Sequence, residues 1–159
     1  MLFSGTYIFM TIKEQISSDL KDAMKSGDTV RRDTLRLVDS AIKNAEIEKK
    51  KRETGLSEEG ILEVLGRAVK QRQDSIRQFT DGGRADLAGK EQIELDIIMP
   101  YLPAQLSEDE IRTVVEDIIS GAGAVSASDM GKIMGQAMGR MKGKADGNVV
   151  KKIVGEELK

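Results

Sequence analysis

The 159-residue chain is long enough for one ordinary domain or two small ones, and with 33% charged residues it is too charged for a membrane protein. It contains no Cys, which excludes disulfides and thiolate chemistry, and no His, which removes the commonest general base and metal ligand. We therefore expect no metal site, no complete catalytic site and no cofactor. Aromatic residues make up only 3% of the chain, which favours helices packed through aliphatic side chains and Met.

The chain begins with residues 1–10, which have neither a positively charged start nor an apolar run that could span a bilayer. We expect this segment to be a disordered extension of a cytoplasmic protein that has no membrane contact. The first helix is expected over residues 11–26 and ends at Gly27. Apolar residues recur in it at every fourth position, namely Ile12, Ile16, Leu20 and Met24.

Three more helices are expected before residue 100. Asp28 is the predicted N-cap of the second, which fades into the basic run 49–52, and its expected core side holds Val30, Thr34, Leu37, Ala41, Ala45 and Glu48. Ser57 starts the third, with a face made of Ile61, Leu65, Ala68, Val69, Arg72, Ile76 and Phe79. A fourth runs from about Arg84 to Pro100. Residues 11–99 are thus predicted to form a helical N-terminal domain.

Pro100 and Pro103 are the two prolines of the chain, and they predict a stiff, extended linker over residues 100–106. Residues 107–159 then read as a small tail domain of three helices. No segment of the chain sustains the period-two alternation of a β-strand. The fold class predicted from the sequence is therefore all-α, with two domains.

Each expected tail helix has a recognisable start. Ser107 and Glu110 fit a capping box, residues 126–129 can cap the second tail helix, and Asp146 can cap the third. The apolar positions that follow have helical spacing: Ile111, Val114, Val115, Ile118 and Ile119, then Met130, Ile133, Met134, Ala137, Met138 and Met141, then Val149, Val150, Ile153, Val154 and Leu158. These side chains are predicted to form the tail core.

Positive charge is concentrated in the tail. Residues 128–154 hold six basic and two acidic side chains, whereas residues 1–127 hold 18 basic and 23 acidic ones. A basic module attached to an acidic body predicts a polyanion as the partner of that module. The candidate phosphate contacts are Lys132, Arg140, Lys142, Lys144 and Lys151.

Glycine recurs at every fourth position across the second tail helix and the loop after it, at Gly131, Gly135, Gly139, Gly143 and Gly147. A glycine in a helix interior costs about 1 kcal/mol relative to alanine. A smooth face that another backbone approaches closely would offset that loss. The approaching backbone is either a neighbouring tail helix or a nucleic acid whose phosphates the flanking cations neutralise.

Two further anion contacts carry weaker signals. The loop 143–147 has glycines at both ends and precedes a helix, so its N–H groups are candidates for an anion, although an ordinary connection between helices explains the same residues. It lacks the spacing of a phosphate-binding loop of nucleotide hydrolases. The basic run 49–52 is a candidate second phosphate contact, but such a run is more often solvated surface.

Several segments together resemble the YqeY family, and the resemblance extends from about Met10 to Leu158. The segments that carry it are Pro-Tyr-Leu-Pro-Ala-Gln-Leu-Ser from Pro100, Asp-Met-Gly-Lys-Ile-Met-Gly from Asp129, Lys-Gly-Lys-Ala-Asp-Gly from Lys142, Val-Lys-Gln-Arg-Gln-Asp-Ser-Ile from Val69 and Glu-Leu-Asp-Ile from Glu94. The family's tail, called the GatB/YqeY domain, is similar to that of the B subunit of the glutamyl/aspartyl-tRNA amidotransferase, which helps to hold the tRNA.

The resemblance implies a tRNA-binding tail, and it also implies carbon–nitrogen ligase activity with glutamine as amido-N-donor. The large domain with which that subunit activates the misacylated tRNA has no counterpart in this sequence, so we do not expect the chain to perform the reaction alone. The favoured hypothesis is a non-catalytic accessory protein that binds tRNA or another structured RNA. The alternatives are an accessory subunit of an amidotransferase or synthetase, and a purely structural protein-interaction module.

Overall fold

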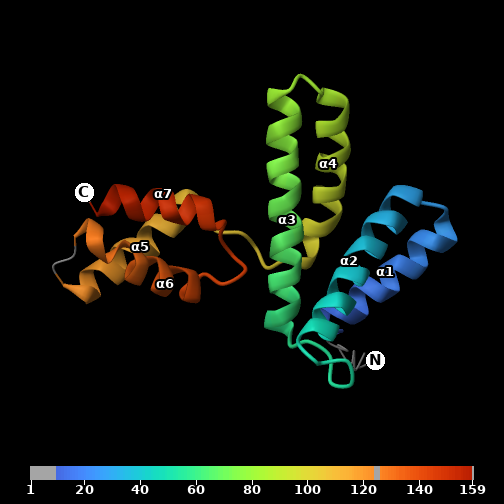
Figure 1. Ribbon diagram of the computed structural model, residues 1–159, viewed down its shortest axis with the longest axis horizontal. Coiled ribbons are helices and arrows are strands. Elements are labelled where there is room, and N and C mark those ends of the chain that lie inside the picture. Colours follow the sequence, from blue (N-terminus) through green and yellow to red (C-terminus); the bar gives the residue numbers. More distant parts are fainter. Residues whose placement is uncertain (1–9, 124–125, 159) are drawn as a thin grey trace, which may run out of the picture. The chain divides into compact units, whose positions relative to one another are not determined.

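The computed structural model describes residues 10–123 and 126–158, and the regular elements of this part of the chain are all helices (Figure 1). The predicted all-α fold class is therefore confirmed. The chain divides into two compact units, one that ends at Tyr101 and one that begins at Leu102. Of the expected disordered extension, residues 1–9 lie outside the described part of the chain.

The first unit consists of two helical hairpins (Figure 1). In one, α1 (Ile12–Ser26) packs against α2 (Thr29–Glu48), and in the other α3 (Glu58–Asp81) packs against α4 (Ala85–Ile98). Helix α2 also packs against both α3 and α4, which joins the hairpins into one core. The predicted caps of α2 and α3 are confirmed, since Asp28 accepts a hydrogen bond from the N–H of Arg31 and Ser57 from that of Gly60. The four helices thus enclose buried apolar side chains, and α2 and α3 begin at side-chain caps.

The predicted core face of α3 is buried at four of its seven positions and half-buried at the other three, whereas the predicted faces of α1 and α2 are partly wrong. Residues Ile61, Leu65, Val69 and Arg72 of α3 are buried as expected, but Met24, Val30 and Leu37 are 53%, 49% and 58% exposed, and Glu48 is exposed too. An α-helix turns by about 100° per residue, so the α1 positions, which are all spaced by four, drift around the axis by about 40° at each step. In α2 the predicted row keeps the helical period but lies at one edge of the buried face, which consists of Thr34, Leu35, Val38, Ile42, Ala45 and Glu46.

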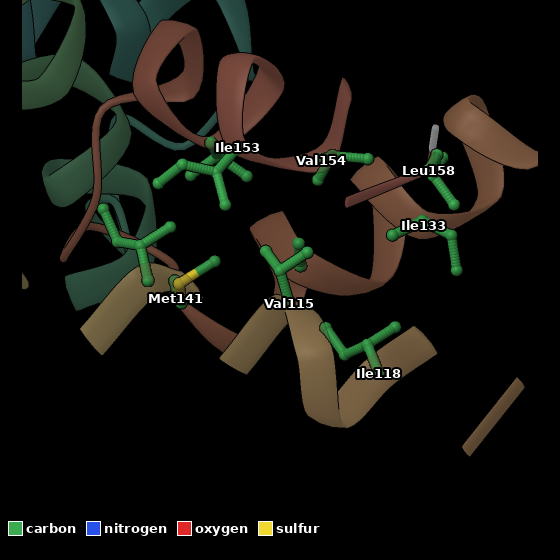
Figure 2. Packing of buried hydrophobic residues seen from close by; sticks show 10 residues of the cluster. Val115, Ile118, Ile133, Met141, Ile153, Val154 and Leu158 are labelled. Atoms are coloured by element: carbon green, nitrogen blue, oxygen red, sulfur yellow. The ribbon is translucent and has the colours of Figure 1, made fainter. Parts of the chain in front are cut away.

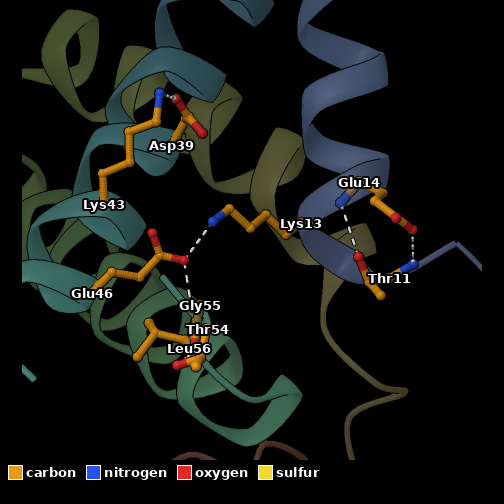
Figure 3. A network of polar contacts seen from close by, with 9 residues as sticks. All are labelled: Thr11, Lys13, Glu14, Asp39, Lys43, Glu46, Thr54, Gly55 and Leu56. Carbon is orange, nitrogen blue, oxygen red and sulfur yellow. Dashed lines mark hydrogen bonds and ion pairs between the residues drawn. The ribbon is translucent and has the colours of Figure 1, made fainter. Parts of the chain in front are cut away.

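A buried carboxylate fastens the first hairpin to the segment that precedes α3 (Figure 3). Glu46 is only 6% exposed, and its Oε1 accepts hydrogen bonds from the ammonium group of Lys13 and, at 3.4 Å, from the N–H of Leu56. The hydrogen bond from Lys13 lowers the pKa of Glu46, and the Leu56 N–H adds to this effect. The carboxylate is thus charged and satisfied within the fold.

The extended linker predicted at Pro100 is wrong for its first residues. Met99–Tyr101 forms a short 3-10 helix, η1, which suits proline because its fixed φ is compatible with a helical turn. Tyr101 is buried, its hydroxyl donates to Asp19, and the hydroxyl oxygen accepts a hydrogen bond from Arg31 at 3.4 Å. Burial and the bond to Asp19 raise the pKa of Tyr101, so the hydroxyl stays protonated. Tyr101 therefore belongs to the core of the first unit.

The second unit contains α5 (Glu108–Ala122), a short 3-10 helix η2 (Ala127–Asp129), α6 (Met130–Arg140) and α7 (Gly147–Glu157). The predicted capping box of α5 is confirmed. The N–H of Glu110 donates to Ser107 Oγ at 3.3 Å, and the N–H of Ser107 donates back to Glu110 Oε2 at 2.8 Å.

One buried core holds the three longer helices of this unit together, and Figure 2 shows part of it. All of its members were predicted from helical spacing: Ile111, Val115, Ile118, Ile133, Ala137, Met141, Val150, Ile153, Val154 and Leu158. Each helix contributes side chains to this core, so the three are mutually dependent for burial. The tail is therefore a three-helix unit, as the sequence predicts.

Candidate nucleic-acid interface

Helix α6 has two distinct sides. Ile133 and Ala137 are fully buried on the side that faces α5 and α7, whereas Gly131, Gly135 and Gly139 are exposed. The methionines of the helix, Met130, Met134 and Met138, are partly buried and pack against the core. The Met row is thus core filling. The glycines belong to the solvent-facing side.

No residue of the tail that the structure describes packs against the glycines of α6. A Cβ atom added at Gly131, Gly135 or Gly139 would meet no heavy atom within 4 Å, apart from the backbone of its own helix. Close contacts occur at the glycines of α7, where the methyl groups of Met residues from α6 come within 3.8 Å of a Cβ at Gly147 and 3.4 Å of one at Gly155. The interpretation of the α6 glycines as an internal packing face therefore finds no contact to support it.

Two of the predicted cations flank this open side of α6. Lys132 follows Gly131 in sequence and Arg140 follows Gly139, and both side chains are exposed. The guanidinium of Arg140 pairs with Asp117 of α5 at 2.6 Å. A pair that is this exposed stabilises by at most about 1 kcal/mol and is screened by salt, so a phosphate can replace the carboxylate at little cost.

Two more predicted cations, Lys142 and Lys144, lie in the loop after α6, and both are exposed. Gly143 between them has φ of 73°, a left-handed conformation that glycine adopts without strain. The loop is tied down by residues that precede α5, because Gln105 Nε2 donates to the Gly143 carbonyl at 2.9 Å and the Leu106 N–H donates to the Lys144 carbonyl at 2.8 Å. Both lysines therefore extend from a fixed backbone.

The start of α7 is already occupied by its own cap. Asp146 accepts hydrogen bonds from the N–H groups of Asn148 at 2.7 Å and Val149 at 3.3 Å. Because these amides are satisfied and a negative charge sits beside them, the backbone of the loop 143–147 is a poor site for an external anion. Lys151, the fifth predicted contact, is exposed on α7. Of the two kinds of predicted anion contact, the geometry leaves the side-chain cations accessible and the loop amides already satisfied.

Sequence reasoning missed the carboxylates that the fold brings close to these cations. Arg112 of α5 pairs with Glu156 and Glu157 of α7, and these bonds raise the pKa of its guanidinium. Asp117 reaches Arg140 across 23 positions of sequence. These ion pairs could not be predicted, because a count of charges along the chain does not show which helices face each other. The tail is thus basic around α6, while α5 carries acidic groups at its edge.

The described residues limit other kinds of site. In the described ranges, no cluster of three or more Asp, Glu, His or Cys side chains is arranged to hold a metal ion. No helix among the same residues has both the length and the apolar character needed to cross a membrane. The basic run 49–52 lies in the first unit, so it is not part of the tail surface.

Fold and surface together define a class of protein. It is an all-α protein of two units, and helix α6 of its three-helix tail has exposed glycines and exposed cations. The chain matches the family model of Yqey-like proteins over residues 13–158, so it belongs to that family. The resemblance inferred from the sequence motifs is thereby confirmed.

Curated relatives of the chain are yeast proteins called "Altered inheritance of mitochondria protein 41, mitochondrial". The protein from Vanderwaltozyma polyspora is 37% identical over 107 residues, which are 66% of this chain and 57% of the relative. The one from Lachancea thermotolerans is 33% identical over 121 residues, 74% of this chain and 63% of the relative. The chain thus spans less than two thirds of the length of these relatives.

The predicted cytoplasmic location is contradicted by these relatives, whose names place them in mitochondria. The prediction failed for a physical reason. Absence of Cys and low hydropathy constrain the chemistry and the solubility of a domain, and a mitochondrial protein meets the same constraints as a cytoplasmic one. Composition therefore carries no information that separates the two compartments.

Proposed function

We propose that this chain binds tRNA or another structured RNA through its tail and performs no catalysis by itself. The observation that carries the proposal is the open side of α6, where three exposed glycines leave room for a close approach and cations stand beside them. Phosphate contacts from Lys and Arg supply most of the sequence-independent affinity for nucleic acid. The resemblance of the tail to that of a tRNA amidotransferase subunit supports the same reading.

The chemistry of the surface favours a folded RNA that is recognised by shape. A helix face without Cβ atoms admits a sugar–phosphate backbone to van der Waals distance of the peptide groups. Binding of single strands relies instead on aromatic side chains on which bases stack. Tyr101 is buried in the first unit, and the tail residues that the structure describes include no aromatic side chain. Recognition is therefore expected through backbone and groove contacts.

Fluorescence anisotropy of labelled total tRNA tests this proposal. The test variant is Lys142→Ala with Lys144→Ala, and the matched control is Lys21→Ala with Lys25→Ala, which removes the same charge from exposed positions of α1. Wild type is expected to bind with an affinity that falls steeply with salt. Loss of two phosphate contacts lowers the slope of log K against log salt by about 2, whereas the control keeps the wild-type slope.

Two results would overturn the proposal. One is absence of tRNA binding by the wild type at both low and near-physiological salt. The other is an equal loss of affinity in the test and control variants, because that would show attraction by overall charge without a tail surface. In either case the search turns to a protein partner, such as an amidotransferase or synthetase subunit.

A further inference from the structure

The first unit has a small hollow between the end of α2 and the start of α3, far along the chain from the tail. Its charged lining side chains are Lys49 and Lys51, and the hydroxyl-bearing residues Thr54 and Ser57 complete its polar wall. None of the described residues that line it is acidic, although the surrounding segment contains several carboxylates. The two charged side chains that line the hollow are therefore both positive, while the carboxylate of Glu46 lies behind Gly55 and that of Glu63 pairs with Lys49.

The backbone around the hollow is fixed by hydrogen bonds. The N–H of Lys51 donates to the Glu46 carbonyl at 2.7 Å, and the N–H of Gly55 donates to the Lys51 carbonyl at 2.7 Å. Lys50 has φ of 53°, in the left-handed region that side chains rarely adopt, and the buried Glu46 holds the N–H of Leu56 (Figure 3). The loop is thus built in one conformation and anchored to the core.

The donors around the hollow match a phosphate group. Ser57 Oγ accepts a hydrogen bond from Gly60, which leaves its own O–H free to donate. Lys51 offers an exposed ammonium group, and the pair between Lys49 and Glu63 at 3.2 Å is exposed on both sides and is easily exchanged. We propose that this hollow binds a phosphate group, with Lys51 as its main charged contact. This site is separate from the tail surface and does not depend on RNA binding there.

NMR of the full-length 15N-labelled chain tests the site with inorganic phosphate, compared with chloride at equal ionic strength. Saturable shifts are expected at the amides of Lys51 and of residues 54–60. Lys51→Ala is expected to weaken phosphate binding about tenfold, the usual effect of losing one hydrogen bond to a charged group. Lys50→Ala is the matched control, because it removes the same charge from the neighbouring residue, whose side chain does not line this hollow.

The proposal is overturned if no saturable shift occurs at these amides, or if Lys50→Ala weakens phosphate binding as much as Lys51→Ala does. The spectra of both variants also report whether they are folded. A second titration with total tRNA identifies the source of the phosphate. Shifts at the same amides that vanish in Lys51→Ala assign it to an RNA backbone, and a response to inorganic phosphate alone assigns it to a small phosphate compound. Both of these results support the site.

Discussion

Replacement of Gly135 by alanine should stabilise the tail. Gly135 lies in the middle of α6, is exposed, and has open space where a Cβ would stand. The substitution therefore gains helix propensity, about 1 kcal/mol, without a steric penalty. If the amides of Ile133 and Val154 exchange through unfolding of the tail, their hydrogen exchange should slow by about fivefold, the factor that corresponds to about 1 kcal/mol. Exchange measured by NMR reports on the tail alone.

Gly143→Ala is the matched control, because Gly143 has φ of 73° and alanine there is strained by about 1 kcal/mol or more. Exchange in the tail should therefore accelerate in this variant. Unchanged or faster exchange in Gly135→Ala would refute the reasoning, since it would mean that the α6 surface is covered in the protein. If the glycine side binds RNA, the same Gly135→Ala variant should also bind tRNA more weakly despite its higher stability.

Three other substitutions have defined outcomes. Ile133→Ala removes a fully buried side chain from the tail core and should destabilise it by about 2–4 kcal/mol, against about 1 for Ile133→Val, measured by urea unfolding. Tyr101→Phe deletes the hydroxyl bonded to Asp19 and should destabilise the first unit by about 1 kcal/mol in the same assay. Glu46→Gln should be destabilising at pH 7. Because the folded pKa of Glu46 is lowered, the wild type loses this advantage as pH falls through that pKa, so unfolding at pH 3 should show a smaller difference.

The tail core was predictable because its three helices are short and each turns one narrow apolar face inward. Ile133, Ala137 and Met141 of the α6 segment, for example, follow the helical period and are all buried. In the first unit the same reasoning failed at Leu37, because the row chosen from local spacing lies at one edge of the side of α2 that α1, α3 and α4 cover. Helix α2 has apolar residues on more than one row, and local spacing does not say which row meets a neighbouring helix.

Tyr101 shows a second limit. Two prolines within four residues are typical of an extended connector, and the sequence around Pro100 contains nothing that favours a turn of helix. What decides the outcome is a buried place for one ring and one hydroxyl, next to Asp19 and Arg31, which are 82 and 70 positions away. Contacts at such distances depend on the assembled helices and cannot be read from a local pattern.

Some features of the candidate interface could be predicted from the sequence and others could not. The cations of α6 and of its loop could be predicted from the sequence motif and the charge count. Lys and Arg at helix ends are usually exposed, so their exposure can be predicted without the tertiary structure. Two other features could be found only in the structure. Arg140 pairs with Asp117, and Asp146 accepts hydrogen bonds from the first N–H groups of α7. The carboxylates of Asp117 and Asp146 make the tail surface less positive than the charge count of the sequence indicates. The predicted cations that remain exposed extend from α6, from α7 and from the loop whose backbone Gln105 holds.

The exposed glycines of α6 lower the stability of that helix. Three exposed glycines in an 11-residue helix cost up to roughly 3 kcal/mol relative to alanine, a large share of the stability of a small domain. Burial of Ile133 and Ala137 in the tail core offsets part of this loss, and under the proposed function the contact of the open glycine side with another molecule offsets more of it. A protein helix and an RNA backbone both fit a smooth face, but they differ in salt dependence. Phosphates release counterions on binding and an apolar helix does not. The cations beside the glycines therefore favour RNA, and the salt slope of binding distinguishes the two.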